Sequence, residues 1–514
     1  MALRTQIVST LTQAIQTTFQ RIPHKVALKC KDQEFTFGQL DKLSNQVAQA
    51  LCTLGIKKGD RVCIYLSNGI EFVLTYLANL KIGAMTVPVN FLYRETELRH
   101  ILLDSGAKVL VAHASQIDMV KKVKTVSCSL ETIIVVEGHT ENSVIISFKD
   151  FMASGSPEPI TAAIYPEDIL GIFYTSGTTG RAKGAMLTQN NLLTNIQSLI
   201  STWELSEKDH FLLCLPLSHM HGLHNGLHGA LVTGMTTILL ERFHAETILD
   251  TLSREKCTLF YGVPTMYTRL LQVPNAGNKY DLSSMRLFVS GSAPLSKEDF
   301  KAFREKFGHT ILERYGMTET AMNISNPYSD ERRPASVGLP LPGVEIRLVN
   351  EKGKGCQTDE VGEIWIRGQN VFKAYWNLPE ETKSAFSKEG WFKSGDLARR
   401  DSEGYYYIIG RKKDLIISGG YNIYPREIEE CLLQHPQILE CAVLGVPDPL
   451  KGEVVKCYLV CSEATTLTES QIIDYYNEKL ASFKIPRKVV FLSKLPRTSS
   501  GKVLKHKLPD YDRL

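Results

Sequence analysis

The sequence predicts an α/β protein with a large N-terminal part, made of two parallel-sheet subdomains and a small β-barrel, and a small α+β C-terminal domain. Strand-like and helix-like segments alternate over residues 60–140 and 165–320, which is typical of parallel sheets covered by helices. Short strands divided by glycines follow over 335–400 and favour a barrel. The pattern changes again near Gly410, and the roughly 100 residues beyond it are enough for a separate core.

The N-terminal segment is basic, because no acidic residue precedes Asp32. Four apolar residues at helical spacing predict an amphipathic helix: Ile7, Leu11, Ile15 and Phe19. A basic start without acidic residues is also typical of a mitochondrial transit peptide. We favour the helix, because a strand-like segment at 25–28 follows too soon for a removable extension. We therefore expect a cytoplasmic protein, with the mitochondrial matrix as the alternative.

The first alternating block is interpreted as strands over 61–65, 85–89 and 108–112, with helices over 71–80 and 95–103. In the second block, the uncharged stretch 211–240 is interrupted by Pro216 and by glycines. We interpret it as strand, active-site loop, helix and strand, and expect no membrane span. A strand over 285–289 ends in Ser290-Gly-Ser-Ala-Pro294. The C-terminal domain is predicted to hold helices over 425–435 and 469–480 and strands over 441–446 and 454–460.

Composition excludes several classes of protein. The 514 residues are 43% hydrophobic and 22% charged, which is ordinary for a globular chain. A net charge of +4 is too small to indicate a nucleic-acid partner. The eleven cysteines include no CxxC pair, so reduced thiols are expected rather than a disulfide framework or a zinc ribbon.

The most informative segment is Tyr174-Thr-Ser-Gly-Thr-Thr-Gly-Arg-Ala-Lys-Gly184, which follows a strand-like apolar run and precedes a helix-like pattern. Glycines and small hydroxyl residues allow backbone N–H groups and hydroxyls to surround phosphate oxygens, and Lys183 adds a cation. The segment lacks the GxxxxGK[ST] pattern of a Walker A loop. It therefore predicts a phosphate-binding loop of another kind.

Three further motifs are weak alone, because each resembles an ordinary turn or a solvated loop. Glu313-Arg-Tyr-Gly-Met-Thr-Glu319 combines an aromatic ring, a hydroxyl and a carboxylate. Ser394-Gly-Asp396 presents a carboxylate after a glycine, and Pro496-Arg-Thr-Ser-Ser-Gly-Lys502 presents a lysine near the C-terminus. The order of all four motifs is specific. Over nearly the whole chain it resembles the superfamily of acyl-CoA synthetases, luciferases and peptide-synthetase adenylation domains.

The resemblance implies ATP-dependent activation of a carboxylic acid as an acyl-adenylate, followed by transfer of the acyl group to coenzyme A. It also implies a nucleotide site. The β- and γ-phosphates would be held by Thr175, Ser176, Gly177, Thr178, Thr179, Gly180 and Lys183. Thr318 would contact the α-phosphate, and Glu319 would bind Mg²⁺, a cation that prefers carboxylate and phosphate oxygens. The adenine pocket would be lined by Gly291, Ser292, Ala293 and Pro294, with Tyr315 stacked on the base.

The same resemblance assigns roles to the rest of the nucleotide site and to the C-terminal domain. Asp396 would bind the ribose hydroxyls, with Arg411 beside it. Lys502 would bridge the attacking carboxylate and the α-phosphate, although a solvated lysine in a basic tail is the alternative. The domains implied are 1–411, for adenylation, and a mobile 414–514, with a hinge at Lys413. Rotation would bring Gly419 and Gly420 to the coenzyme A tunnel.

The acid is predicted from Arg314, because a fatty-acid pocket should hold no unpaired charge. The segments 312–327, 285–295 and 263–271 resemble the malonyl-CoA synthetase branch, whereas the residue between His219 and His221 differs from that pattern. We expect Arg314, together with Arg286, to pair with the distal carboxylate of malonate or methylmalonate. A structural ion pair, for example with Glu313, is the alternative for Arg314.

Other hypotheses remain open at this point. His219, His221, His224 and His228 are interpreted as a family segment in which His219 shapes the site or gates the thiol, and a metal site is the alternative. A medium- or long-chain fatty-acid or aryl-acid ligase, and an enzyme that loads a separate carrier protein, are alternative functions. A luciferase-like oxygenase and a non-catalytic scaffold are the weaker ones. The partners expected are the acid, ATP and coenzyme A, without nucleic acid, in a monomer or homodimer.

Overall fold

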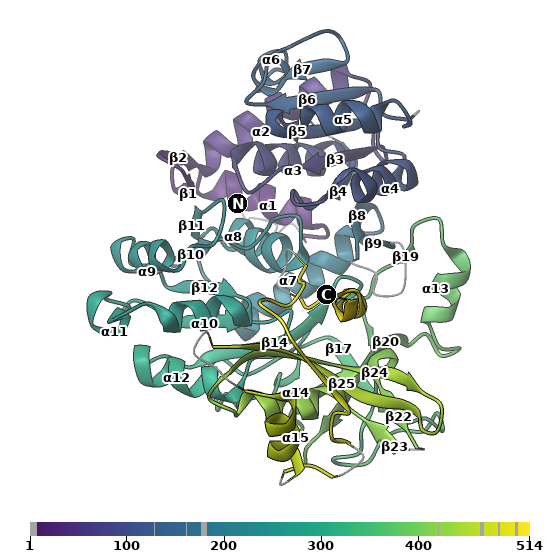
Figure 1. Cartoon of the computed structure of the whole chain (residues 1–514). Helices are drawn as coiled ribbons and strands as arrows, with labels where there is room; N and C mark the ends of the chain where they lie inside the picture. The colour runs from purple at the N-terminus through teal and green to yellow at the C-terminus, as the bar shows by residue number, and fades with distance from the viewer. Residues whose placement is uncertain are drawn as a thin grey trace.

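The computed structural model describes residues 8–127, 129–160, 162–175, 182–419, 421–462, 467–477, 479–481, 484–498 and 502–513. Its strands form four sheets. Figure 1 shows the sheet that contains β3 (Arg61–Tyr65) to β9 (Gly184–Thr188) at the top, the sheet that contains β10 (His210–Leu213) to β14 (Ile311–Met317) in the middle and the two smaller sheets below them. The yellow C-terminal segment returns from the bottom of that view toward the centre of the molecule.

The sheet at the top is mainly parallel, as the alternation of strands and helices predicts. Its described strands, in spatial order, are β19 (Ala374–Tyr375), β9 (Gly184–Thr188), β8 (Ile169–Tyr174), β4 (Met85–Pro88), β3 (Arg61–Tyr65), β5 (Val109–His113), β6 (Thr132–Val136) and β7 (Ile145–Ser147). Its helices are α2 (Phe37–Thr53), α3 (Ile70–Ile82), α4 (Glu95–Ser105), α5 (Ile117–Lys124) and α6 (Phe148–Ala153). α3 is buried on nearly every face, because it packs between layers rather than on the surface.

The middle sheet is parallel in its centre and antiparallel at both edges. Its described strands, in spatial order, are β16 (Leu339–Pro340), β15 (Ala321–Ser325), β14 (Ile311–Met317), β13 (Leu287–Ser290), β12 (Leu259–Gly262), β10 (His210–Leu213), β11 (Thr236–Leu239), β1 (Val26–Cys30) and β2 (Gln33–Thr36). Its helices are α1 (Leu11–Arg21), α7 (Gln189–Thr202), α8 (Gly229–Thr233), α9 (Ala245–Arg254), α10 (Pro264–Gln272), α11 (Ala276–Lys279) and α12 (Lys297–Phe307).

Local sequence explains where these helices begin. Thr188 and Asn191 form a capping box at the start of α7, in which each side chain accepts a hydrogen bond from the other's backbone N–H. The stretch 211–240 forms β10, a loop, a π-helix (η2, His221–His228), α8 and β11, so the predicted order is confirmed. α1 confirms the N-terminal helix, whereas Ile7 lies outside the described residues. No helix in the described part of the chain is long and apolar enough to cross a membrane.

The third sheet differs from the predicted barrel in one respect. β17 (Val344–Val349), β18 (Gly362–Gly368), β20 (Phe392–Arg400) and β21 (Tyr406–Arg411) form an antiparallel sheet in that order, and β16 and β19 join the two larger sheets instead. Four strands are too few to close around an interior of side chains, so the segment packs as an open layer. α13 (Pro379–Ala385) lies between β19 and β20 in the chain.

The fourth sheet and its two helices form the predicted α+β C-terminal domain. It holds β23 (Tyr421–Ile423), β22 (Ile416–Ser418), β25 (Gly452–Cys461) and β24 (Ile438–Asp448), with β26 (Lys488–Phe491) paired to β25. α14 (Pro425–Leu433) and α15 (Glu469–Asn477) cover it and share a separate apolar core with it. A short 3₁₀ turn, η3 (Lys412–Asp414), links β21 of the third sheet to β22 of the fourth.

Candidate active site

The predicted motifs meet at the carboxyl ends of parallel strands, which is where open α/β sheets bind ligands. The glycine-rich segment follows β8, and Gly291-Ser-Ala-Pro294 follows β13. β13 and β14 are parallel neighbours with Ser290 opposite Glu313, so the segment after Ser290 lies beside Arg314 and Tyr315. The fold therefore places three distant parts of the sequence around one site.

At the phosphate loop, the structure describes the two ends only. The N–H of Thr175 donates to the carbonyl of Lys183 over 2.9 Å, which closes the loop at its base. The predicted phosphate ligands Ser176, Gly177, Thr178, Thr179 and Gly180 lie outside the described residues. Nζ of Lys183 lies 5.2 Å from the ring centre of Tyr375, a cation–π contact.

Tyr375 links this loop to the predicted magnesium ligand. Its hydroxyl donates to Oε1 of Glu319 over 2.9 Å. Glu319 is buried, and burial raises the pKa of its carboxyl, which the Tyr375 hydrogen bond opposes. Sequence reasoning missed Tyr375, because an isolated tyrosine in a short edge strand belongs to none of the motifs.

Asp396 is held from two sides. The hydroxyl of Tyr315 donates to its Oδ2 over 2.6 Å, and Nε of Arg411 lies 3.1 Å from its Oδ1. The Asp396 charge raises the pKa of Arg411, while burial and that same charge raise the pKa of Tyr315. The structure thus brings these three predicted nucleotide residues together.

Lys502 reaches the same site from the C-terminal domain. Its backbone N–H donates to Oγ1 of Thr498 over 3.0 Å, and the N–H of Thr498 donates to the carbonyl of Lys502 over 2.7 Å. Its side chain has accessible surface, yet it lies close enough to Arg411, Asp396 and Glu319 to interact with their charges. Partial removal from water, with the charge of Arg411, lowers the pKa of Lys502.

Arg314 is a buried cation, and two of its guanidinium nitrogens have no hydrogen-bond partner in the described part of the chain. Only 5% of the residue is exposed, and its Nε and Nη2 are buried without a hydrogen-bond partner. Burial lowers its pKa to about 9, so the group remains charged at neutral pH. Glu313, proposed above as an alternative partner, instead accepts the N–H of Leu295 on Oε1 over 3.0 Å, because neighbouring strand residues point to opposite faces.

The prediction that Arg286 binds the distal carboxylate of the acid is wrong. Its Nε and Nη2 each lie 2.7 Å from an oxygen of Asp209, and Nη1 donates to the carbonyl of Trp203 over 3.0 Å. It precedes β13, at the amino end of that strand, whereas the site lies at the carboxyl end, roughly 13 Å away at about 3.3 Å per residue. Arg286 is therefore a structural ion-pair residue and cannot bind the acid beside Arg314.

Two histidines border the site near Arg314. Nε2 of His219 accepts from Nδ2 of Asn90 over 2.9 Å, because Oδ1 of Asn90 accepts the N–H of Leu92 and so fixes the amide. Burial and the positive charge of Lys502 lower the pKa of His219 to about 4. Nδ1 of His221 lies 3.3 Å from Oγ of Ser292, a residue with a left-handed φ of 71°. Such strain in a non-glycine residue is typical of functional sites.

The other two histidines do not form a metal site. Nδ1 of His224 lies 3.0 Å from Nδ1 of His228, and both rings are fully buried. Within the described residues, no group of three or more His, Cys, Asp or Glu side chains is arranged to hold a metal ion.

The residue predicted for the hinge lies two positions after Arg411, whereas Gly419, predicted for coenzyme A, follows β22. Lys413 is exposed in η3. Gly419 has a left-handed φ of 58° and donates its N–H to the carbonyl of Lys451 over 2.8 Å; Gly420 lies outside the described residues. In the adjoining strand β23, Nδ2 of Asn422 donates to Glu351 over 3.2 Å, so this hairpin faces the third sheet.

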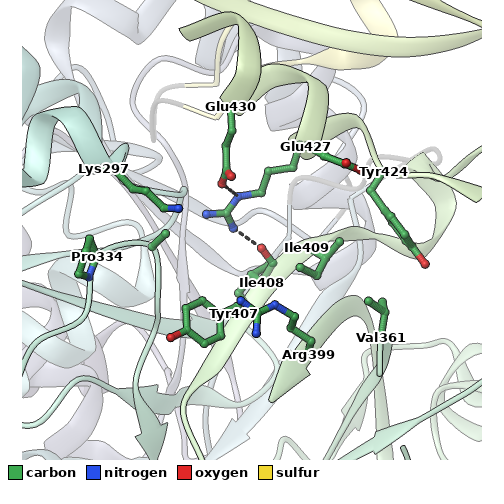
Figure 2. A pocket seen from close by; sticks show the side chains of 12 residues that line it. Lys297, Pro334, Val361, Arg399, Tyr407, Ile408, Ile409, Tyr424, Glu427 and Glu430 are labelled. Carbon is green, nitrogen blue, oxygen red and sulfur yellow. Dashed lines mark hydrogen bonds and ion pairs between the residues drawn. The ribbon is translucent and has the colours of Figure 1, made fainter. Parts of the chain in front are cut away.

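A cavity of about 330 Å³ lies where the C-terminal domain meets the body of the protein, and Figure 2 shows Glu427 and Glu430 of α14 facing Tyr407, Ile408 and Lys297 across it. Arg426 bridges this junction, because it pairs with Glu430 and donates to the carbonyl of Ile408. Its described lining includes none of the predicted site residues. We therefore interpret it as part of the domain junction.

Comparison with known proteins identifies the family of the chain. The family described as "AMP-binding enzyme" matches residues 15–376, and "AMP-binding enzyme C-terminal domain" matches 427–502. The crystal structure of ATP-bound MatB from Rhodopseudomonas palustris superposes with a TM-score of 0.91 at 37% identity, covering 98% of this chain and 99% of that one.

Relatives with different named substrates are about equally similar. The malonate–CoA ligase of Arabidopsis thaliana is 33% identical, over 94% of this chain and 86% of its own. The long-chain-fatty-acid–CoA ligase of Bacillus subtilis is 34% identical, over 97% of this chain and 94% of its own. The predicted family is confirmed, as is the likeness to its malonyl-CoA synthetase branch. The chain therefore belongs to the AMP-binding enzyme family and is an ATP-dependent, AMP-forming acid–CoA ligase.

Proposed function

We propose that this ligase activates malonate or methylmalonate, and that Arg314 binds the carboxylate that does not react. The proposal rests on the buried guanidinium, two of whose nitrogens have no partner among the residues that the structure describes, because an uncompensated buried charge costs several kcal/mol unless a ligand pairs with it. A dicarboxylic acid keeps one anionic group after the other has been adenylated. A planar guanidinium can accept that group in two parallel hydrogen bonds.

Similarity alone does not select this substrate, because the malonate and long-chain-fatty-acid ligases differ by one percentage point in identity to the chain. The charge of Arg314 favours malonate over a long-chain fatty acid. An alkyl chain in contact with Arg314 would leave the charge desolvated and unpaired, whereas a short acid with a distal carboxylate would neutralise it.

We assign the adenylation step as follows. One carboxylate oxygen attacks the α-phosphorus of ATP, and the bond from that phosphorus to the oxygen bridging the β-phosphate breaks, releasing pyrophosphate. Two anions must approach each other, so the main task of the protein is charge neutralisation. Lys502 would supply a cation whose charge interacts with those of Asp396 and Glu319, and Thr318 would add a hydroxyl next to Glu319.

The nucleotide would be held by groups that the site already orients. Tyr315 and Arg411 fix Asp396, which would bind the ribose hydroxyls, and Lys183 would bind the phosphates. The buried carboxylate of Glu319 fits Mg²⁺, because its hard oxygens suit that ion and a cation would offset its burial. When bound together with the phosphates, the ion supplies additional positive charge.

In the second step, the sulfur of coenzyme A attacks the carbonyl carbon of the adenylate, the thiol loses its proton and AMP leaves. His219, with a pKa of about 4, is a weak base near neutrality, so we assign it to shaping the site. Lys502 has no task in this step. We propose that rotation at Lys413 withdraws it and brings the hairpin with Gly419 to the thiol.

A substrate panel tests the proposal. The purified chain is given ATP, Mg²⁺ and coenzyme A with malonate, methylmalonate, acetate, octanoate, palmitate or ferulate, and both AMP and thioester are measured. We expect the highest kcat/KM for malonate or methylmalonate. Thioester from octanoate or palmitate but none from malonate would refute the dicarboxylate assignment. AMP without thioester would indicate a separate carrier protein as the acceptor.

A further inference from the structure

A chain of four buried side chains runs from α3 through the π-helix to α7. The hydroxyl of Tyr76 lies 2.5 Å from Nε2 of His228, whose Nδ1 lies 3.0 Å from Nδ1 of His224. Nε2 of His224 lies 3.0 Å from Oδ1 of Asn195. All four residues are at most 1% exposed, and none of their polar atoms lacks a partner.

The backbone determines the direction of every hydrogen bond in this chain. Asn195 donates through Nδ2 to the carbonyl of Met322 over 2.7 Å and accepts the N–H of Met322 on Oδ1 over 3.1 Å, which fixes its amide. Oδ1 can only accept, so Nε2 of His224 carries a hydrogen and, in the neutral ring, Nδ1 accepts. Nδ1 of His228 must then donate, its Nε2 accepts, and the hydroxyl of Tyr76 donates.

One end of this chain adjoins the hairpin that carries Arg314, and its two histidines lie in the π-helix that begins at His221. Met322, which exchanges two hydrogen bonds with Asn195, is paired with Gly316 in the hairpin of β14 and β15. Arg314 lies in β14 of the same hairpin. The π-helix begins at His221, whose ring stacks on Tyr261 at 6.4 Å and interacts with the charge of Arg314. A π-helix is rare and is often found at functional sites. His228, His224 and Asn195 therefore connect the π-helix that begins at His221 to the hairpin that carries Arg314.

We propose that Tyr76, His228, His224 and Asn195 form a positioning network that sets the distance between His221 and Arg314 and so tunes the binding of the acid. None of the four touches the reacting atoms. The network joins the helix layer of the first sheet, through Tyr76, to the middle sheet. The inference rests on the ligase activity and on the placement of the acid beside Arg314.

The test uses Tyr76→Phe, which removes one hydroxyl and keeps the ring. Loss of one buried hydrogen bond corresponds to about 1 kcal/mol, so we expect roughly a fivefold increase in KM for the acid with the highest turnover. KM for ATP should stay within about twofold, because the nucleotide residues belong to other elements. Tyr458→Phe is the matched control, because it removes the hydroxyl of a buried tyrosine that donates only to Asp512 in the C-terminal domain.

A second readout does not depend on the substrate. ¹⁵N spectra of the full chain labelled at histidine should show a neutral ring protonated at Nε2 for His224 and at Nδ1 for His228, with the His228 signals shifted by Tyr76→Phe. Asn195→Asp provides a second variant, which keeps the acceptors but loses the donor to Met322. Reversed tautomers, or an unchanged KM for the acid in both variants, would overturn the network. If the preferred acid is a monocarboxylate, the dicarboxylate proposal fails and the two readouts still decide this one.

Discussion

Gly291 gives the guanidinium of Arg314 the space that it occupies. A β-carbon built on Gly291 would lie 2.5 Å from both Cζ and Nε of Arg314, closer than real β-carbons approach other atoms. Because Arg314 is buried, its guanidinium has little room to move aside. The glycine after β13 and the cation in β14 thus form one structural unit of the pocket.

Gly291→Ala should displace Arg314 and raise KM for the acid by about tenfold, the equivalent of 1.4 kcal/mol, with a smaller change in KM for ATP. Gly229→Ala is the matched control, because a β-carbon there would make ordinary contacts of 3.6 and 3.8 Å. Steady-state kinetics with each substrate varied in turn measure both. An unaffected KM for the acid in Gly291→Ala would show that Arg314 does not bind it.

Arg314→Ala should lower kcat/KM for malonate about 10- to 100-fold, since a hydrogen bond to a charged group contributes about 1.5–3 kcal/mol. Activity with acetate should fall much less, because acetate has no second carboxylate. The ratio of the two kcat/KM values is the measurement. Equal losses for both acids would indicate a structural arginine.

Arg286→Leu should lower the stability of the protein and leave its preference among acids unchanged. It leaves the carboxylate of Asp209, whose side chain is 4% exposed, without its bidentate partner, so the thermal midpoint should fall by several degrees. The preference for malonate over acetate should not change in the folded fraction. A thermal melt and the acid panel together check this expectation, and an altered acid preference would contradict the reassignment of Arg286.

Lys502→Ala should lower acid-dependent release of pyrophosphate by about 10²- to 10³-fold, as expected when one electrostatic group is removed from a transition state. Formation of the thioester from chemically prepared acyl-adenylate should be largely retained. Lys507→Ala, in the same basic segment, is the control. Equal loss of both half-reactions would argue against a role confined to adenylation.

Glu313→Gln should alter the pH dependence of stability. Burial raises the pKa of Glu313 to about 7, above its ordinary value of 4.5, so the folded state binds the proton more tightly. The stability that this group contributes is fully present below pH 4.5 and is lost as the pH rises through 7, up to about 3 kcal/mol. At pH 8 the Gln variant should therefore melt at a higher temperature than the unmodified protein.

At pH 4.5 the difference between Glu313→Gln and the unmodified protein should be small. Thermal melts from pH 4.5 to 8.5 measure it, with Glu305→Gln, at an exposed position of α12, as the control. A constant offset at every pH would show that the effect is one of packing rather than of protonation.

The sequence predicts the layers of this fold well, and it predicts which strand–turn motifs lie at the same edge, because such motifs determine where a chain crosses the edge of a parallel sheet. The sequence does not distinguish the role of Arg314 from that of Arg286. Both lie within candidate pocket segments, yet Arg314 lies within β14 and Arg286 precedes the amino end of β13. The partner of Arg286, Asp209, is 77 residues away. Tyr375 and Asn195 belong to no motif, because long-range contacts alone bring them to Glu319 and to the histidines.

The bond between Arg411 and Asp396 also has a mechanical consequence. Arg411 is the last residue of β21, and the next residue, Lys412, lies 3.0 Å from Glu363 of β18. These two ion pairs hold the polypeptide to the third sheet up to Lys412. The proposed rotation at Lys413 would therefore use only a few backbone torsions. Asp396 belongs to one of these ion pairs and is also the residue proposed to bind the ribose. Release of the nucleotide and release of the hinge would therefore involve the same carboxylate.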